Sequence, residues 1–144
     1  MTASSMLHGD VTAVLRDWPA PDLGQRALRE AFGGFLAARP DATQRSCVPG
    51  HITASAVVLS ADHRSVLLTL HPRIGRWVQL GGHCEPEDTD IEAAALREAT
   101  EESGITGLRL GELAAIHVHA LTCSLGLPTR HLDLQFVATA PAGT

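Results

Sequence analysis

The chain has 144 residues, a hydrophobic fraction of 44% and a formal net charge of -5, which fits one globular domain that buries about two thirds of its unfolded surface. The acidic balance argues against a nucleic-acid polymer as partner, and the absence of a run of about 18 apolar residues argues against a membrane span. The 3 cysteines are widely spaced and the N-terminus lacks a basic region followed by an apolar core, so we expect a cytoplasmic protein with reduced thiols.

Residues 1–45 have the apolar spacing of two short helices. The turn residues Pro21 and Asp22 separate two apolar stripes, and Pro40 is expected to end the second helix. We expect this helical segment to pack on the domain that follows, residues 46–144, or to form a subunit contact. The stripes consist of Val11, Val14, Leu15 and Trp18, and of Leu28, Phe32, Phe35 and Leu36.

The next part of the chain alternates strands with one long helix. A tight turn at Gly81 and Gly82 is expected to expose backbone carbonyls before the helix, and a break in the fourth strand is expected near Gly111 and Glu112. The apolar runs predict strands at residues 52–59, 65–71, 77–80, 108–121 and 131–138.

Residues 90–103 are predicted to form that helix, with Asp88 or Thr89 as its N-cap and Gly104 just past its end. Its apolar spacing indicates a single buried stripe, which two glutamates extend toward the C-terminal end. The stripe consists of Ile91, Ala94, Ala95 and Ala99, followed by Glu98 and Glu102.

Three carboxylates share one face of this helix. Glu98, Glu101 and Glu102 stand at i, i+3 and i+4, where like charges repel. Arg97 lies four residues before Glu101 and can pair with it, whereas Glu98 and Glu102 have no such local cation. Because half-buried carboxylates need a partner, we interpret Glu98 and Glu102 as ligands of a hard divalent cation.

Residues 82–105 resemble the Nudix box, the signature of the Nudix hydrolases. The box runs glycine, five residues, glutamate, seven residues and then Arg-Glu-aliphatic-x-Glu-Glu-x-Gly-aliphatic. The first half here, from Gly82 to Arg97, is one residue longer than in the box. An insertion after Gly82 explains this difference. Glu85, Glu87 or Asp88 can therefore fill the early glutamate position. The second half matches at Arg97, Glu98, Glu101, Glu102, Gly104 and Ile105, with Ala99 at the aliphatic position.

The resemblance implies an α/β fold, namely a Nudix-type α/β/α sandwich with a mixed β-sheet, preceded here by the helices of residues 1–45. Residues 66–83 and 131–137 are also similar to segments of the family. Many Nudix domains add a strand and a helix after the last strand predicted here. Either this chain is truncated at Thr144, or its N-terminal helices cover the sheet in place of that strand and helix.

The resemblance also implies a hydrolase that uses Mg²⁺ or Mn²⁺ to cleave the pyrophosphate linkage of a nucleoside diphosphate linked to another moiety. Glu98, Glu101 and Glu102 match the metal-binding glutamates of the family, and the carbonyl of Gly82 matches a further ligand. Arg97 matches the arginine that orients them, and Glu101 is our first choice as the general base. The expected partner is a nucleotide-derived small molecule, and a homodimer is one assembly open to such a domain.

Further residues are candidate substrate contacts. Arg73 and Arg76 can bind phosphate, although solvated loop arginines are equally common. Trp77 can stack on a base, unless it is a core tryptophan at the start of a strand. Asp133 is our second choice as the general base, because its strand can place it at the same site.

Two alternatives remain open. A catalytically silent Nudix-like domain would bind a nucleotide or a partner without turnover. A His/Asp metalloprotein would use His117, His119, His131 and Asp133, which stand in i, i+2 pairs on their strands, whereas the plainer interpretation is that these side chains line a cleft.

Overall fold

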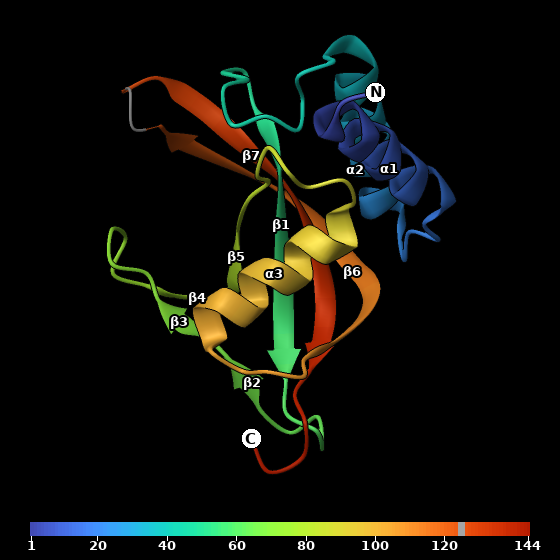
Figure 1. The fold of residues 1–144 in the computed structure, drawn as a ribbon. Helices are drawn as coiled ribbons and strands as arrows, with labels where there is room; N and C mark the ends of the chain where they lie inside the picture. Colours follow the sequence, from blue (N-terminus) through green and yellow to red (C-terminus); the bar gives the residue numbers. More distant parts are fainter. Residues whose placement is uncertain (124–125) are drawn as a thin grey trace.

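The computed structural model describes residues 1–123 and 126–144, and within them it contains a mixed β-sheet, a small hairpin and three helices (Figure 1). This confirms the predicted α/β fold with helices ahead of the sheet. None of the helices in the described part of the chain is both long and apolar enough to cross a membrane. The helices are α1 (Ala3–Asp17), α2 (Leu23–Ala38) and α3 (Ile91–Ser103), and the strands are β1 (His51–Leu59), β2 (Val66–Leu67), β3 (Thr69–Leu70), β4 (Trp77–Val78), β5 (Leu80–His83), β6 (Arg109–Thr122) and β7 (Pro128–Thr139).

Strand β1 is the centre of the main sheet. It runs parallel to β7 from His51, which lies opposite His131, to Leu59, which lies opposite Thr139. On its other edge it pairs antiparallel with β5 and then with β2, and β6 pairs antiparallel with β7. The strand order is therefore β2-β1-β7-β6, with β5 beside β1, while β3 and β4 form the separate hairpin.

The two faces of β1 and β7 differ in chemistry, because successive side chains of a strand point to opposite faces. On one face, apolar side chains join the core that the buried residues of α1, α2 and α3 complete. On the other face, polar side chains alternate with them and line a pocket. The apolar set includes Ile52, Ala54, Leu132, Leu134 and Phe136, and the polar set includes Thr53, Ser55, His131 and Asp133.

Helix α3 lies across the sheet, and its buried stripe is the predicted one (Figure 1). Gly104 follows the helix with a φ of 69°, as predicted for the residue past its end. The N-cap, however, is Asp90, whose side chain accepts from the N–H of Ala93. The prediction of Asp88 or Thr89 was therefore wrong, and the Asp88 carboxylate is instead engaged by the N–H of Glu85 and by Arg97.

The N-terminal helices are fixed to β6 by two side chains. The indole N–H of Trp18 donates to the carbonyl of Leu113 at 2.9 Å. The Gln25 side chain accepts from the N–H of Ile116 at 2.8 Å and donates to the carbonyl of the same residue at 3.0 Å. Strand β6 is the outer strand, so no further strand can pair with the N–H and carbonyl of Ile116. The Gln25 side chain satisfies these two groups instead.

Two predicted strands differ from the observed ones. Residues 65–71 do not form one strand, because Val66 and Leu67 pair with β1 whereas Thr69 and Leu70 pair with β4. Residues 77–80 are likewise divided between β4 and β5. The break expected within 108–121 is observed as a register shift between Leu110 and Leu113.

The sequence suggested a tight turn at the glycine pair, and this prediction was wrong, because both glycines belong to β5. Gly81 lies opposite Ser55 and Gly82 lies opposite Ala54. A Cβ atom added to Gly81 would lie 2.5 Å from Cβ of Ser55 and 2.7 Å from the carbonyl oxygen of Ala54. Glycine is required here because the two strands approach too closely for any side chain.

We expect Gln25→Ala to lower the free energy of unfolding by about 1–3 kcal/mol, because it leaves the N–H and carbonyl of Ile116 without their partner. Urea denaturation measures this loss. The control is Gln44→Ala, since Gln44 is exposed and its amide contacts the hydroxyl of Ser4. Equal stability of the two variants would contradict the role given to Gln25.

Candidate active site

Arg97 on α3 lies among four carboxylates. Its Nη1 is 3.0 Å from Oε1 of Glu98 and 3.1 Å from Oε1 of Glu85, and its Nη2 is 2.9 Å from Oδ2 of Asp88. Oε2 of Glu101 is 3.6 Å from Nη1. One guanidinium therefore holds a carboxylate cluster in place, since its fork of donors can serve several oxygens at once.

The inserted residue ahead of the helix leaves two carboxylates beside Arg97. Asp88 is the better shielded, with a side chain 12% exposed, whereas that of Glu85 is 52% exposed. The N–H of Glu85 donates to Asp88 at 2.7 Å, so the two residues form one small loop against Arg97. Of the three residues open for the early glutamate position, Asp88 and Glu85 are those that contact the arginine.

Glu98 and Glu102 face the pocket beside Gly82. A Cβ atom on Gly82 would lie 2.8 Å from Oε2 of Glu98, so a side chain at this position would displace the carboxylate. Burial and the neighbouring Glu98 raise the pKa of Glu102. Glu102 is more exposed than its place on the helical stripe suggested. Two neighbouring carboxylate groups beside the half-buried Gly82 offer the oxygen donors that a hard divalent cation binds.

Glu101 differs from these two glutamates. Its side chain is 60% exposed and contacts Arg97 from the outer side of the helix. Among the described residues that line the pocket, α3 contributes Glu98 and Glu102 but not Glu101.

The pocket has a volume of about 1820 Å³ and extends from the polar sheet face to the loop between β3 and β4. Arg73 and Arg76 line it from this loop, together with His71. Trp77 is 65% exposed, which rules out the core position considered for it, and it lies outside the described lining residues. The structure therefore brings the two arginines, but not the tryptophan, to the pocket wall.

Asp133 lies on the floor of the pocket and is only 5% exposed. Its carboxylate accepts from the Thr53 hydroxyl at 2.9 Å and also from the Ser55 hydroxyl. Burial raises the pKa of Asp133, and the two hydroxyl donors offset part of this effect.

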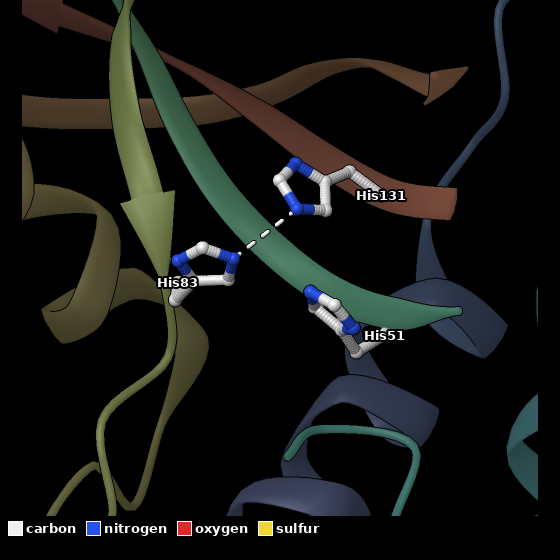
Figure 2. Close-up of side chains that lie close together, drawn as sticks. All are labelled: His51, His83 and His131. Carbon is white, nitrogen blue, oxygen red and sulfur yellow. Dashed lines mark hydrogen bonds between the residues drawn. The ribbon is translucent and has the colours of Figure 1, made fainter. Parts of the chain in front are cut away.

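Three histidines converge at one end of the pocket. Figure 2 shows the rings of His51, His83 and His131 turned toward one another from β1, β5 and β7. Their centroids are 4.8 to 5.1 Å apart, and Nε2 of His83 lies 3.2 Å from Nε2 of His131. Burial is the main cause that lowers the pKa of His83 and that of His131 to about 4.

This triplet is not the histidine group suggested by strand spacing. His117 lies opposite Asp133 and His119 lies opposite His131, and the rings of His117 and His119 stack at 5.8 Å. However, the group of described residues that brings its ligand atoms within reach of one metal ion is His51, His83 and His131. Sequence reasoning did not include His51 or His83 in a metal site, because neither the pairing of β1 nor the extent of β5 could be read from spacing.

No curated protein matches the sequence. Among solved structures, an Ap4A hydrolase of C. elegans is 24% identical, with 62% of this chain and 69% of that chain covered and a TM-score of 0.45. A NUDIX family hydrolase from Clostridium perfringens is 27% identical, with 65% and 70% covered and a TM-score of 0.47.

A bifunctional NMN adenylyltransferase/ADP ribose pyrophosphatase from Francisella tularensis is 23% identical, with 83% of this chain and 36% of that chain covered and a TM-score of 0.39. The family model of the NUDIX domain matches residues 49–138, which include β1, the carboxylate cluster of α3 and β7 up to Ala138. Because this match spans more than half of the 144 residues, the chain belongs to the Nudix domain family.

Proposed function

We propose that this Nudix domain is a hydrolase that depends on a divalent cation and cleaves the pyrophosphate linkage of a nucleoside diphosphate linked to another moiety. The observation that carries the proposal is the position of Arg97. It contacts Glu85, Asp88 and Glu98 and leaves Glu98 and Glu102 on the pocket wall. A domain that only binds a ligand has no need to hold repelling carboxylates together.

Glu98, Glu102 and the carbonyl of Gly82 would hold Mg²⁺ or Mn²⁺, with Glu101 as a further ligand or as the general base. Such a cation, when bound, lowers the pKa of water and neutralises phosphoryl oxygens. Arg97 would hold Glu98 and Glu101 in place for this role. Asp133, on the floor of the pocket, remains the second candidate for the base.

Substrate phosphates would meet the positive charges of the loop between β3 and β4. Arg73 and Arg76 line the pocket there, and guanidinium groups bind phosphate oxygens in pairs. Trp77 is the first residue of β4 and directly follows Arg76. We therefore propose it as a stacking surface for a base at the rim of the pocket. The pocket is wide enough for a nucleotide derivative, which fits a small-molecule substrate.

The homodimer and the cytoplasmic location stay predictions. Size-exclusion chromatography with light scattering checks the first, and fractionation of cells that express the native protein checks the second.

The activity is tested with a hydrolysis screen of nucleoside diphosphate derivatives and triphosphates in Mg²⁺ or Mn²⁺. Ap4A and ADP-ribose are included because they occur in the names of two similar structures. We expect turnover of at least one compound, and its loss when EDTA removes the cation. Absence of any turnover by folded protein would favour the catalytically silent binding domain.

We expect Glu102→Gln to reduce this turnover by on the order of 100-fold, the scale on which one group that stabilises a transition state acts. The matched control is Glu92→Gln, because Glu92 is an exposed glutamate in the first turn of the same helix. Steady-state kinetics on both variants decide the point. Equal rates for Glu102→Gln and wild type would contradict the assignment of Glu102.

We expect Asp133→Asn to raise the free energy of unfolding at neutral pH. An aspartate ionises near pH 3.9 in the unfolded chain, whereas burial raises its pKa in the folded protein. Between the two pKa values the folded state binds more protons, so wild-type stability falls as the pH rises through this interval and stays reduced above it. Asparagine keeps one acceptor oxygen and removes the buried charge.

Urea denaturation from pH 8 down to about pH 4 measures the difference, which should shrink as the pH approaches the ordinary pKa of aspartate. The control is Glu112→Gln, a loss of one carboxylate at an exposed position. A stability gain for Asp133→Asn that is independent of pH would contradict the electrostatic explanation.

A further inference from the structure

We propose that His51, His83 and His131 form a second metal site, one that binds a divalent transition-metal ion of the Zn²⁺ class and is distinct from the carboxylate site on α3. This site does not rest on the proposed hydrolase activity. The donor atoms of the three side chains lie within 4.8 Å of one another. Imidazole nitrogen suits zinc and its neighbours in the periodic table, whereas carboxylate and carbonyl oxygen suit Mg²⁺.

The sheet itself builds the triplet. His51 lies directly opposite His131 in the parallel pairing of β1 with β7. His83 lies opposite Thr53, which is two residues beyond His51 and therefore on the same face of β1. Three neighbouring strands thus supply one ring each, and backbone hydrogen bonds fix the positions from which the rings project (Figure 2).

One donor nitrogen of the triplet is buried and has no partner. His51 is 3% exposed, and its Nδ1 bonds the carbonyl of Cys47 at 3.1 Å. A carbonyl only accepts, so Nδ1 carries the proton and Nε2 is left with a free lone pair. No described residue hydrogen-bonds this Nε2, although it is inaccessible to solvent. An imidazole whose far nitrogen donates to a backbone carbonyl is the arrangement that orients a histidine ligand.

The distances fit such an ion after a small movement of the side chains. Zinc binds histidine nitrogen at about 2.0–2.1 Å in tetrahedral geometry, which places two ligand nitrogens about 3.3 Å apart. The separation of 3.2 Å between Nε2 of His83 and Nε2 of His131 is already close to this value. The ligand atom of His51 lies within 4.8 Å of the other two, and binding of the ion would close the remaining gap.

The fourth position of this ion would open into the pocket. His83 and His131 line the pocket, whereas His51 forms the buried back of the triplet. Arg45 lines the same pocket, and after burial its positive charge is one of the causes that lower the pKa of both His83 and His131. A positive side chain beside the ion favours an anion as fourth ligand, such as hydroxide or a phosphate oxygen.

The test uses untagged protein of the full sequence, stripped of metal with EDTA and dialysed. Competition with a chromophoric chelator measures the affinity for Zn²⁺, and the absorption spectrum of bound Co²⁺ reports nitrogen ligands in tetrahedral geometry. We expect about one tightly bound Zn²⁺ per chain. A folded wild-type protein that does not compete with the chelator would overturn the proposal.

Variants separate this site from the carboxylate site. Loss of a residue that only orients a metal ligand lowers affinity by about 10- to 100-fold, so His83→Gln and His131→Gln should each cost about 100-fold or more. Glu102→Gln and His117→Gln should keep the wild-type affinity. Circular dichroism of the metal-free variants establishes that each is folded, and the buried His51 is left unchanged for this reason.

Two results would overturn the assignment. Unchanged Zn²⁺ affinity in both His83→Gln and His131→Gln would show that the triplet is not the site. Loss of Zn²⁺ binding in Glu102→Gln would place the ion among the carboxylates instead. Because the readout is binding of Zn²⁺ alone, failure of the hydrolysis screen leaves this test unaffected.

Discussion

The parallel pairing of β1 with β7 is the constraint on which the rest of the structure depends. It sets nine residues of one strand beside nine of the other, from His51 and His131 to Leu59 and Thr139. Because both strands alternate in the same phase, one sheet face is continuously apolar and the other carries polar groups. The helices cover the first face, and the second becomes the floor of the pocket.

Local features of the sequence predicted α3 well, because a helix is specified by neighbours three and four residues apart. The buried stripe and the terminal Gly104 both follow from this spacing. The glycine pair was misjudged for the opposite reason. Nothing near Gly81 in the sequence shows that Ser55 will approach its Cα, since that contact comes from strand pairing across more than twenty residues. The proximity of His51 and His83 could not be predicted for the same reason, since it also comes from the pairing of strands that are distant in the sequence.

Arg97 illustrates how one side chain can be predicted while its surroundings are not. Its pairing with Glu101 followed from helical spacing, and the observed separation of 3.6 Å is the longest of its four ion pairs. Two of the three shorter contacts, those to Glu85 and Asp88, come from the loop that the extra residue lengthens. The loop therefore engages both terminal nitrogens of the arginine. The pocket retains oxygen donors at α3 and nitrogen donors at the far end of β1, and the two sets differ in the metals that they favour.

The bidentate contact of Gln25 with Ile116 has a consequence for self-association. An outer strand with free N–H and carbonyl groups is a template onto which a second chain can add a strand, and this is a common route to aggregation. The Gln25 amide occupies both groups of Ile116 at the middle of β6 and imitates the missing neighbour. Growth of the sheet from one molecule into the next is thereby blocked at this point, and α2 protects the domain as well as completing its core.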